Sequence, residues 1–191
     1  MSVFNISAYA LLIGFFIIER FVRRGKDTKK MDRTSHDKGS TTVISIVMGV
    51  AFILLPVSPL LNWLRIGAIH APAVAGFGLV LGVAGLVVRY IAFSALGTFF
   101  TRTLRESENH VLITGGIYKY IRHPGYLSDF LIFIGAALAM SNWMSIAVIP
   151  ITFAFAYAYR INVEEKMLVA IFKEQYTDYQ KTSKRLIPFI L

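Results

Sequence analysis

The densest group of polar residues in the chain lies between residues 110 and 126 and has the sequence HVLITGGIYKYIRHPGY. Gly115 and Gly116 allow a tight turn in which the backbone comes close to a ligand. Pro124 suits the first turn of a helix, where its missing N–H group costs nothing. A helix that begins there directs unpaired backbone N–H groups toward its N-terminus, where they attract anions such as carboxylates. The segment therefore predicts an anion-binding site close to His123.

The same residues also fit a purely structural role. Tyr118 and Tyr126 are of a type that anchors helices at the interface between membrane and water, and Arg122 and His123 suit that region as well. The residue types by themselves leave both interpretations open.

A second group of charged residues, Arg160, Glu164 and Glu165, directly follows a long apolar stretch. Glu164 comes four residues after Arg160, so both lie on one face of a helix. In one interpretation the two form a surface ion pair, worth at most about 1 kcal/mol. In the other they bind a ligand that carries both a negative and a positive charge.

Two ionisable residues, Arg89 and Asp129, lie within otherwise apolar stretches. Charged groups inside a membrane are functional candidates by default, although Arg89 can also extend to the interface or pair with Asp129. His36 and His70 are isolated, so the spacing of histidines and carboxylates predicts no metal site. The chain has no cysteine, which excludes a thiolate nucleophile.

Membrane helices must position these residues. The chain has 191 residues, of which 55% are hydrophobic, and the apolar residues form long uncharged blocks. A helix needs about 20 mostly apolar residues to cross the hydrocarbon layer. The blocks predict spans at residues 3–20, 41–61, 71–95, 126–140 and 143–160. We therefore expect residues 1–191 to form one all-α, polytopic membrane domain with about five transmembrane helices, the last two a helical hairpin.

The basic residues predict the orientation of this domain. Eight lysines and arginines lie between residues 20 and 38, whereas the loop after the second span carries only Arg65. Cytoplasmic loops carry an excess of such residues, so we expect the first loop in the cytoplasm, the N-terminus outside and the C-terminus inside. Membrane topology then explains the net charge of +9 better than nucleic-acid binding does.

Two polar regions, residues 99–126 and 160–191, fall on the cytoplasmic side in this topology. Apolar residues between 163 and 179 recur at helical spacing with charged residues between them, which predicts a cytoplasmic amphipathic helix. Such a helix can lie on the membrane surface, or its start, where it leaves the last span, can carry residues over a pocket. The two regions are therefore expected to build one site, on the side where nucleotide-derived cofactors are found.

Together these motifs resemble the isoprenylcysteine carboxyl methyltransferase (ICMT) family of integral membrane methyltransferases, which is related to the phospholipid methyltransferases. The resemblance rests on residues 110–126, on Arg160-x-x-x-Glu164-Glu165 and on a tail with the sequence RLIP at 185–188. It covers about the last half of the chain. The first two spans match the family only in hydrophobicity and length.

The resemblance implies S-adenosylmethionine as the cofactor and a lipophilic methyl acceptor that arrives from the bilayer, with a carboxylate like that of isoprenylcysteine. Arg160 is expected to orient the acceptor carboxylate. The implied cofactor pocket consists of Thr103, His110, Val111, Leu112, Ile113, Tyr118, His123, Pro124, Gly125, Tyr126 and Glu164. Membrane lipids are the other expected partners.

Two other functions stay open. A membrane reductase of the sterol or steroid type, which uses NADPH, has a similar C-terminal region. Glu164 and Glu165 disfavour it, because adjacent negative charges repel the phosphates of a dinucleotide. A non-enzymatic membrane module is the third reading, although the chain lacks the paired broken helices typical of transporters.

Overall fold

The structure is a computed structural model that describes residues 2–22, 39–96 and 112–187. The described residues form helices, which confirms the all-α class. In chain order these are α1 (Val3–Val22), α2 (Ser40–Trp63), α3 (Pro72–Leu96), the 3-10 helix η3 (Gly116–Lys119), α4 (Pro124–Met140), α5 (Trp143–Phe172) and α6 (Glu174–Thr182).

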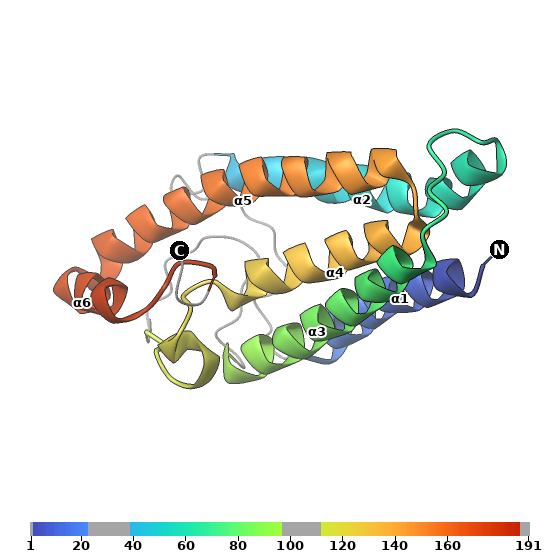
Figure 1. The fold of residues 1–191 in the computed structure, drawn as a ribbon. Coiled ribbons are helices and arrows are strands. Elements are labelled where there is room, and N and C mark those ends of the chain that lie inside the picture. Colours follow the sequence, from blue (N-terminus) through green and yellow to red (C-terminus); the bar gives the residue numbers. More distant parts are fainter. Residues whose placement is uncertain (1, 23–38, 97–111, 188–191) are drawn as a thin grey trace.

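Helix α4 lies at the centre of the bundle, with α2 and α5 on one side and α1 and α3 on the other (Figure 1). Ile132, Phe133 and Ala136 of α4 are fully buried. The ring of Phe133 contacts Phe15 of α1 and Phe153 of α5, at centroid distances of 5.3 and 5.0 Å. The apolar core is thus built around the helix that begins at the predicted anion-binding segment.

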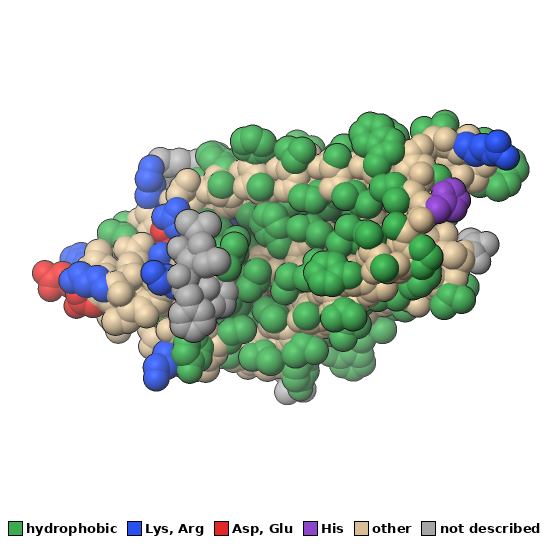
Figure 2. All heavy atoms as spheres, in the orientation of Figure 1, with side chains coloured by type: hydrophobic (Ala, Val, Ile, Leu, Met, Phe, Trp, Pro, Cys, Tyr) green, Lys and Arg blue, Asp and Glu red, His purple; other side chains and the backbone are tan. Residues whose placement is uncertain are grey.

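The visible surface is apolar along the length of the bundle and carries its charged side chains at the ends (Figure 2). Among the described residues, α1, α2, α3 and α5 are long and apolar enough to cross a membrane, and α4 is a shorter apolar helix. Phe16, Val80 and Phe155 point outward with more than half of their surface exposed. Exposed apolar area of this extent is typical of a surface that faces lipid.

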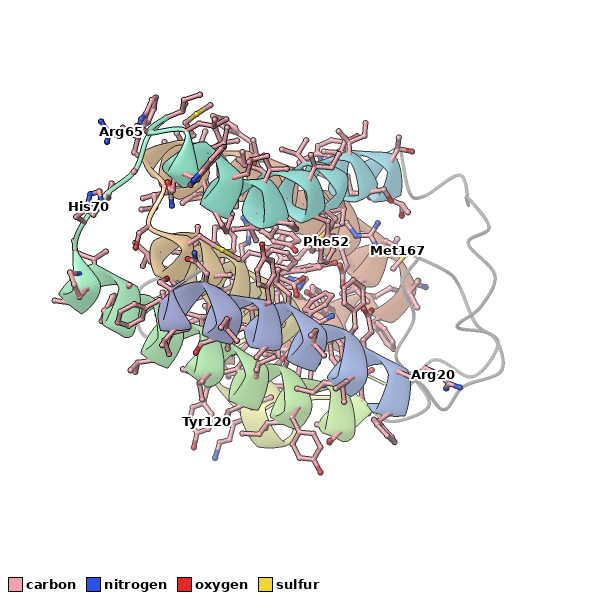
Figure 3. All side chains as sticks on the ribbon, turned by 90° about the vertical axis from the view of Figure 1, so that its right-hand side faces the viewer. Arg20, Phe52, Arg65, His70, Tyr120 and Met167 are labelled. Carbon is pink, nitrogen blue, oxygen red and sulfur yellow. The ribbon has the colours of Figure 1, made fainter. Side chains whose placement is uncertain are left out.

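The loops lie at opposite ends of the bundle. Figure 3 shows Arg65 and His70 at one end and Arg20 at the other. The turn between α4 and α5 belongs to the first end, because the side-chain amide of Asn142 donates to the carbonyl of Ile66 at 2.9 Å. Helix α4 therefore runs from one end of the bundle to the other and forms a hairpin with α5.

The contact between α3 and α4 depends on glycine. Gly78 and Gly82 of α3 lie one turn apart, a spacing that predicts the close approach of a second helix. The close contact of Gly135 in α4 with both glycines confirms this prediction. A Cβ atom added to Gly135 would lie 2.5 Å from both the carbonyl oxygen of Gly78 and the backbone nitrogen of Gly82. A side chain at Gly135 therefore requires the helix backbones to move apart.

Gly135→Ala is accordingly expected to lower the free energy of unfolding by about 1–3 kcal/mol, the usual cost of overpacking a tight core. Gly76→Ala is the matched control, because a Cβ atom on Gly76 meets nothing within 4 Å. Thermal unfolding of the detergent-purified protein measures both changes. Equal melting temperatures for the two variants would contradict the close approach of α3 and α4.

The end of the last long helix differs from the expectation. The sequence predicts a span that ends at Arg160 and a separate amphipathic helix over 163–179, but α5 continues without a break to Phe172. Lys173, which has a positive φ of 50°, separates it from α6. No proline or glycine lies between Arg160 and Phe172, so nothing stops the helix at the edge of the apolar stretch. Consequently Arg160 and Glu164 share one rigid helix.

Candidate active site

Helix α4 begins with the residues predicted to bind an anion. Pro124 occupies its first turn, and the N-cap residue His123 makes no side-chain capping hydrogen bond. The N–H groups of Gly125 and Tyr126 belong to the first turn, where backbone donors have no partner within the helix. The buried ring of His123 stacks on Tyr126 with 5.6 Å between centroids. The start of α4 thus offers backbone donors beside an aromatic pair.

Arg160, Tyr126 and Glu164 form a connected group between α4 and α5. The Tyr126 hydroxyl donates to the Glu164 carboxylate and accepts from Nε of Arg160 at 3.1 Å. Nε of Arg160 also lies 3.9 Å from Oε2 of Glu164. The Arg160 side chain is 6% exposed and that of Glu164 is 22% exposed. The cation is therefore buried between helices, whereas the carboxylate can be reached by a ligand.

The other end of the Arg160 guanidinium reaches a third helix. Nη1 donates to Oγ of Ser40 at 2.7 Å and to Oγ1 of Thr41 at 3.0 Å, both in the first turn of α2. These partners are neutral hydroxyls, so they orient the guanidinium without cancelling its charge. Sequence reasoning missed both residues, because they lie about 120 positions from Arg160 and are of an ordinary type for a helix start.

Glu165 has surroundings different from those of its neighbour Glu164. Its Oε1 accepts from Nε of Arg122 at 2.9 Å and lies 3.3 Å from Nε2 of His123. Its Oε2 accepts from Nη2 of Arg185 at 2.6 Å. The side chain is 5% exposed. Glu165 therefore joins α5 to the segment before α4 and to the C-terminal tail.

The C-terminal tail pairs with the segment before α4. The backbone N–H groups of Arg122 and His123 donate to the carbonyls of Lys184 and Arg185, at 2.8 and 3.2 Å. The N–H group of Lys184 donates back to the carbonyl of Tyr120 at 2.9 Å. The tail is thus fixed beside the start of α4.

Two buried tyrosines complete this end of the bundle. The Tyr179 hydroxyl donates to the carbonyl of Tyr118 at 2.6 Å. Burial raises the pKa of Tyr179 to about 12, although the hydrogen bond with Ser183 and the charge of Arg122 act in the opposite direction. Burial, aided by the charge of Glu164, also raises the pKa of Tyr118. Both hydroxyls therefore stay protonated at neutral pH and act as donors.

Comparisons of the sequence and of the fold identify known proteins that are similar to this chain. Residues 78–170 match the model of the isoprenylcysteine carboxyl methyltransferase (ICMT) family, and this range contains α4 and the charged group of α5. The structure of a eukaryotic intramembrane Ras methyltransferase, also an ICMT, aligns with 100% of this chain and 69% of that one, with a TM-score of 0.66 and 25% identity. The chain is therefore similar to this family in sequence over residues 78–170 and in fold over its whole length. It is thus an integral, multi-pass membrane protein, in agreement with its apolar helices.

Curated proteins of the ICMT family show the same similarity. The protein-S-isoprenylcysteine O-methyltransferase of Tribolium castaneum is 34% identical over 118 residues, which are 61% of this chain and 42% of the relative. That of Dictyostelium discoideum is 35% identical over 119 residues, covering 59% and 48%. Enzyme A of Arabidopsis thaliana is 26% identical over 197 residues, covering 99% and 95%. The match spans about half the length of the first two relatives.

Most of the predicted pocket residues lie together at one end of the ICMT-like bundle. Those that surround the starts of η3 and α4 and the second half of α5 are Tyr118, His123, Pro124, Gly125, Tyr126 and Glu164. Leu112 and Ile113 are half-buried and come shortly before η3. Thr103, His110 and Val111 lie outside the described residues, so their place in the pocket stays a prediction.

The pairing of Arg89 with Asp129, one of the alternatives open from the sequence, is confirmed. Nη1 of Arg89 donates to Oδ1 of Asp129. Arg89 is 3% exposed, so it does not extend to the interface. This pair lies within the helices of the bundle rather than among the pocket residues.

Glu165→Gln is expected to loosen the tail and to lower the free energy of unfolding by about 1–3 kcal/mol, because Arg122 and Arg185 lose a charged partner in a buried place. Hydrogen exchange over residues 174–187 measures the effect. The control is Asp178→Asn, which breaks an ion pair with Lys181 that is more than two-thirds exposed. Wild-type exchange in the Glu165→Gln variant would show that other contacts hold the tail.

Proposed function

We propose that this protein is an S-adenosylmethionine-dependent methyltransferase that methylates the carboxylate of a lipophilic acceptor, as in the O-methylation of an isoprenylcysteine. The observation that carries the proposal is the group of Arg160, Tyr126 and Glu164. A buried cation and a reachable carboxylate are joined there by one hydroxyl, at the end of a membrane bundle. The names of the relatives from Tribolium and Dictyostelium support the same reaction.

The residues around the start of α4 fit the charged end of S-adenosylmethionine, which carries an ammonium and a carboxylate. The reachable carboxylate of Glu164 suits the ammonium. The uncapped first turn, with the N–H groups of Gly125 and Tyr126, suits the carboxylate. Glu165 is buried and already bound by basic residues, so it does not compete. When bound, the cofactor supplies a methyl group activated by a sulfonium.

The proposed reaction needs few catalytic groups. An acceptor carboxylate is ionised at neutral pH, so no general base is required and catalysis rests on positioning and on exclusion of water. Arg160 orients the acceptor carboxylate through a charge-assisted hydrogen bond. Tyr126, Ser40 and Thr41 hold the guanidinium between α2, α4 and α5 for that purpose.

We also propose that α4 crosses the membrane together with the four longer helices α1, α2, α3 and α5, with the N-terminus outside and the active site in the cytoplasm. Helix α4 has 17 residues, a length of about 26 Å, close to the roughly 30 Å of the hydrocarbon layer. The basic loop between α1 and α2 joins helices at the end where Ser40 contacts Arg160, and basic loops stay in the cytoplasm.

Cysteine labelling tests the orientation, because the chain has no cysteine of its own. In intact cells, a membrane-impermeant maleimide should label His70→Cys. It should label Lys184→Cys only after lysis. Labelling of Lys184→Cys in intact cells would reverse the topology.

Parallel calorimetric titrations with S-adenosylmethionine, S-adenosylhomocysteine and NADPH test the cofactor. We expect the two adenosyl ligands to bind and NADPH not to bind. Binding of NADPH alone would favour a reductase instead. Transfer of a labelled methyl group to an S-prenylated N-acetylcysteine, with the corresponding methyl ester as the unreactive control, tests the acceptor.

A further inference from the structure

A second group of polar residues lies deeper in the bundle and makes no contact with the acceptor or cofactor in the proposed reaction. It consists of Glu19, Arg89, Asp129 and Tyr157, which come from α1, α3, α4 and α5 and are each less than 10% exposed. Ionisable residues at membrane depth are costly and usually serve a function. The contacts of this group therefore need an explanation.

Arg89 is fixed at the centre of this group. Its Nη1 donates to the Asp129 carboxylate and to Oγ of Ser128 at 3.3 Å. Its Nη2 lies 3.7 Å from Oε1 of Glu19. The guanidinium also lies over the ring of Phe15, 4.1 Å from its centroid. Contacts on several sides therefore hold the Arg89 guanidinium in one defined position.

Two chains of contacts run from Arg89 to the first turn of α4. In the first, the Tyr157 hydroxyl donates to Oδ2 of Asp129 at 2.6 Å, and the Tyr157 ring stacks on the ring of Tyr126 with 4.9 Å between centroids and an angle of 25°. In the second, Oγ of Ser128 donates to the carbonyl of Gly125 at 2.6 Å. Both chains end at the turn that carries Tyr126.

We propose that Arg89, Asp129 and Tyr157 are positioning residues that hold the ring of Tyr126. The inference rests on the proposed function, because the Tyr126 hydroxyl bridges the two charged residues of the site. A buried ion pair adds little stability, since desolvation offsets the attraction between the charges. What it provides here is one fixed arrangement of helices beside the site, where small displacements reduce the reaction rate.

A double-mutant cycle with Tyr157→Phe and Tyr126→Phe tests this role. Tyr157→Phe keeps the ring and removes only the hydroxyl that binds Asp129. We expect it to reduce kcat/KM for methyl transfer by about tenfold, because misplaced catalytic groups lower rates steeply. In the Tyr126→Phe background the same change should have less than about a twofold effect, because residues that act through one group are not additive. Equal reductions in both backgrounds would overturn the proposal.

Asp129→Asn is the second variant, and the same non-additive pattern with Tyr126→Phe is expected for it. Tyr9→Phe is the matched control, since it removes a tyrosine hydroxyl that donates to the carbonyl of Pro56 at 2.9 Å, away from this group. It should leave kcat/KM unchanged. If Tyr9→Phe lowered kcat/KM as much as Tyr157→Phe does, a general loss of stability would explain both reductions, and the positioning role would be overturned.

The cycle is measured in two ways, so that it separates this inference from the proposed function. An inactive wild type would contradict the proposed reaction. The affinity for S-adenosylhomocysteine, measured by calorimetry, still reports whether Tyr157 acts through Tyr126. Additive effects of the two substitutions on that affinity would contradict the positioning role alone.

Discussion

Replacing Arg160 with alanine is expected to reduce methyl transfer to an acidic lipophilic acceptor by about 100- to 1,000-fold, the usual effect of removing one preorganised donor from a site that stabilises charge. Affinity for S-adenosylhomocysteine should change little, because Glu164 and the first turn of α4 remain. The reason is the position of the guanidinium, which is buried and held in place by Tyr126, Ser40 and Thr41.

Two further variants separate charge from geometry. Arg160→Lys keeps the positive charge but lacks the planar fork that reaches Tyr126 and α2 together, so an intermediate rate is expected. Ser40→Ala keeps the guanidinium and removes one of the hydroxyls that orient it, so its effect should be the smallest. If Arg160→Ala weakens cofactor binding and leaves turnover intact, Arg160 belongs to the cofactor site instead.

The membrane helices were predictable because lipid places a strong demand on sequence. A span needs a long uncharged block, and the block predicted at 71–95 corresponds to α3, Pro72–Leu96. The Gly78 and Gly82 spacing likewise predicted close helix packing, because small residues are what allow it. Residues 163–179 are helical apart from Lys173, but the first part of this stretch continues α5, since the loss of apolar character after Arg160 marks the edge of an apolar stretch rather than the end of a helix.

Contacts within the candidate site could be predicted only where its residues are neighbours in sequence. The motif from His123 to Tyr126 and the pair of Arg160 with Glu164 were found from local spacing. Ser40 was not, because contacts between distant helices leave no trace in the local pattern.

Glu164 and Glu165 show a second limit on what can be predicted from local sequence. Successive residues in an α-helix are rotated by about 100°, so the two carboxylates face different neighbours. Glu164 meets Tyr126 of α4, whereas Glu165 meets Arg185 of the tail. The sequence identifies an acidic pair, and only the packing of the tail shows that one of its members is structural.

The different surroundings of Glu164 and Glu165 predict a second substitution with a large effect, this time on cofactor affinity. Glu164→Gln is expected to weaken binding of S-adenosylmethionine and S-adenosylhomocysteine by about 10- to 100-fold, because a hydrogen bond to a charged partner contributes about 1.5–3 kcal/mol. Glutamine still accepts the hydrogen bond from Tyr126, so the fold should be unaffected. Only the negative charge proposed to bind the cofactor ammonium is lost.

Glu165→Gln is the matched control, because the same chemical change is made one residue away. Its carboxylate is 5% exposed and is bound by Arg122 and Arg185. We expect it to lower stability more than cofactor affinity, whereas Glu164→Gln should do the reverse. Calorimetry and thermal unfolding on both variants give the four values needed. The opposite pattern would assign the ammonium to Glu165 and would require the tail to move away from α5 before the cofactor binds.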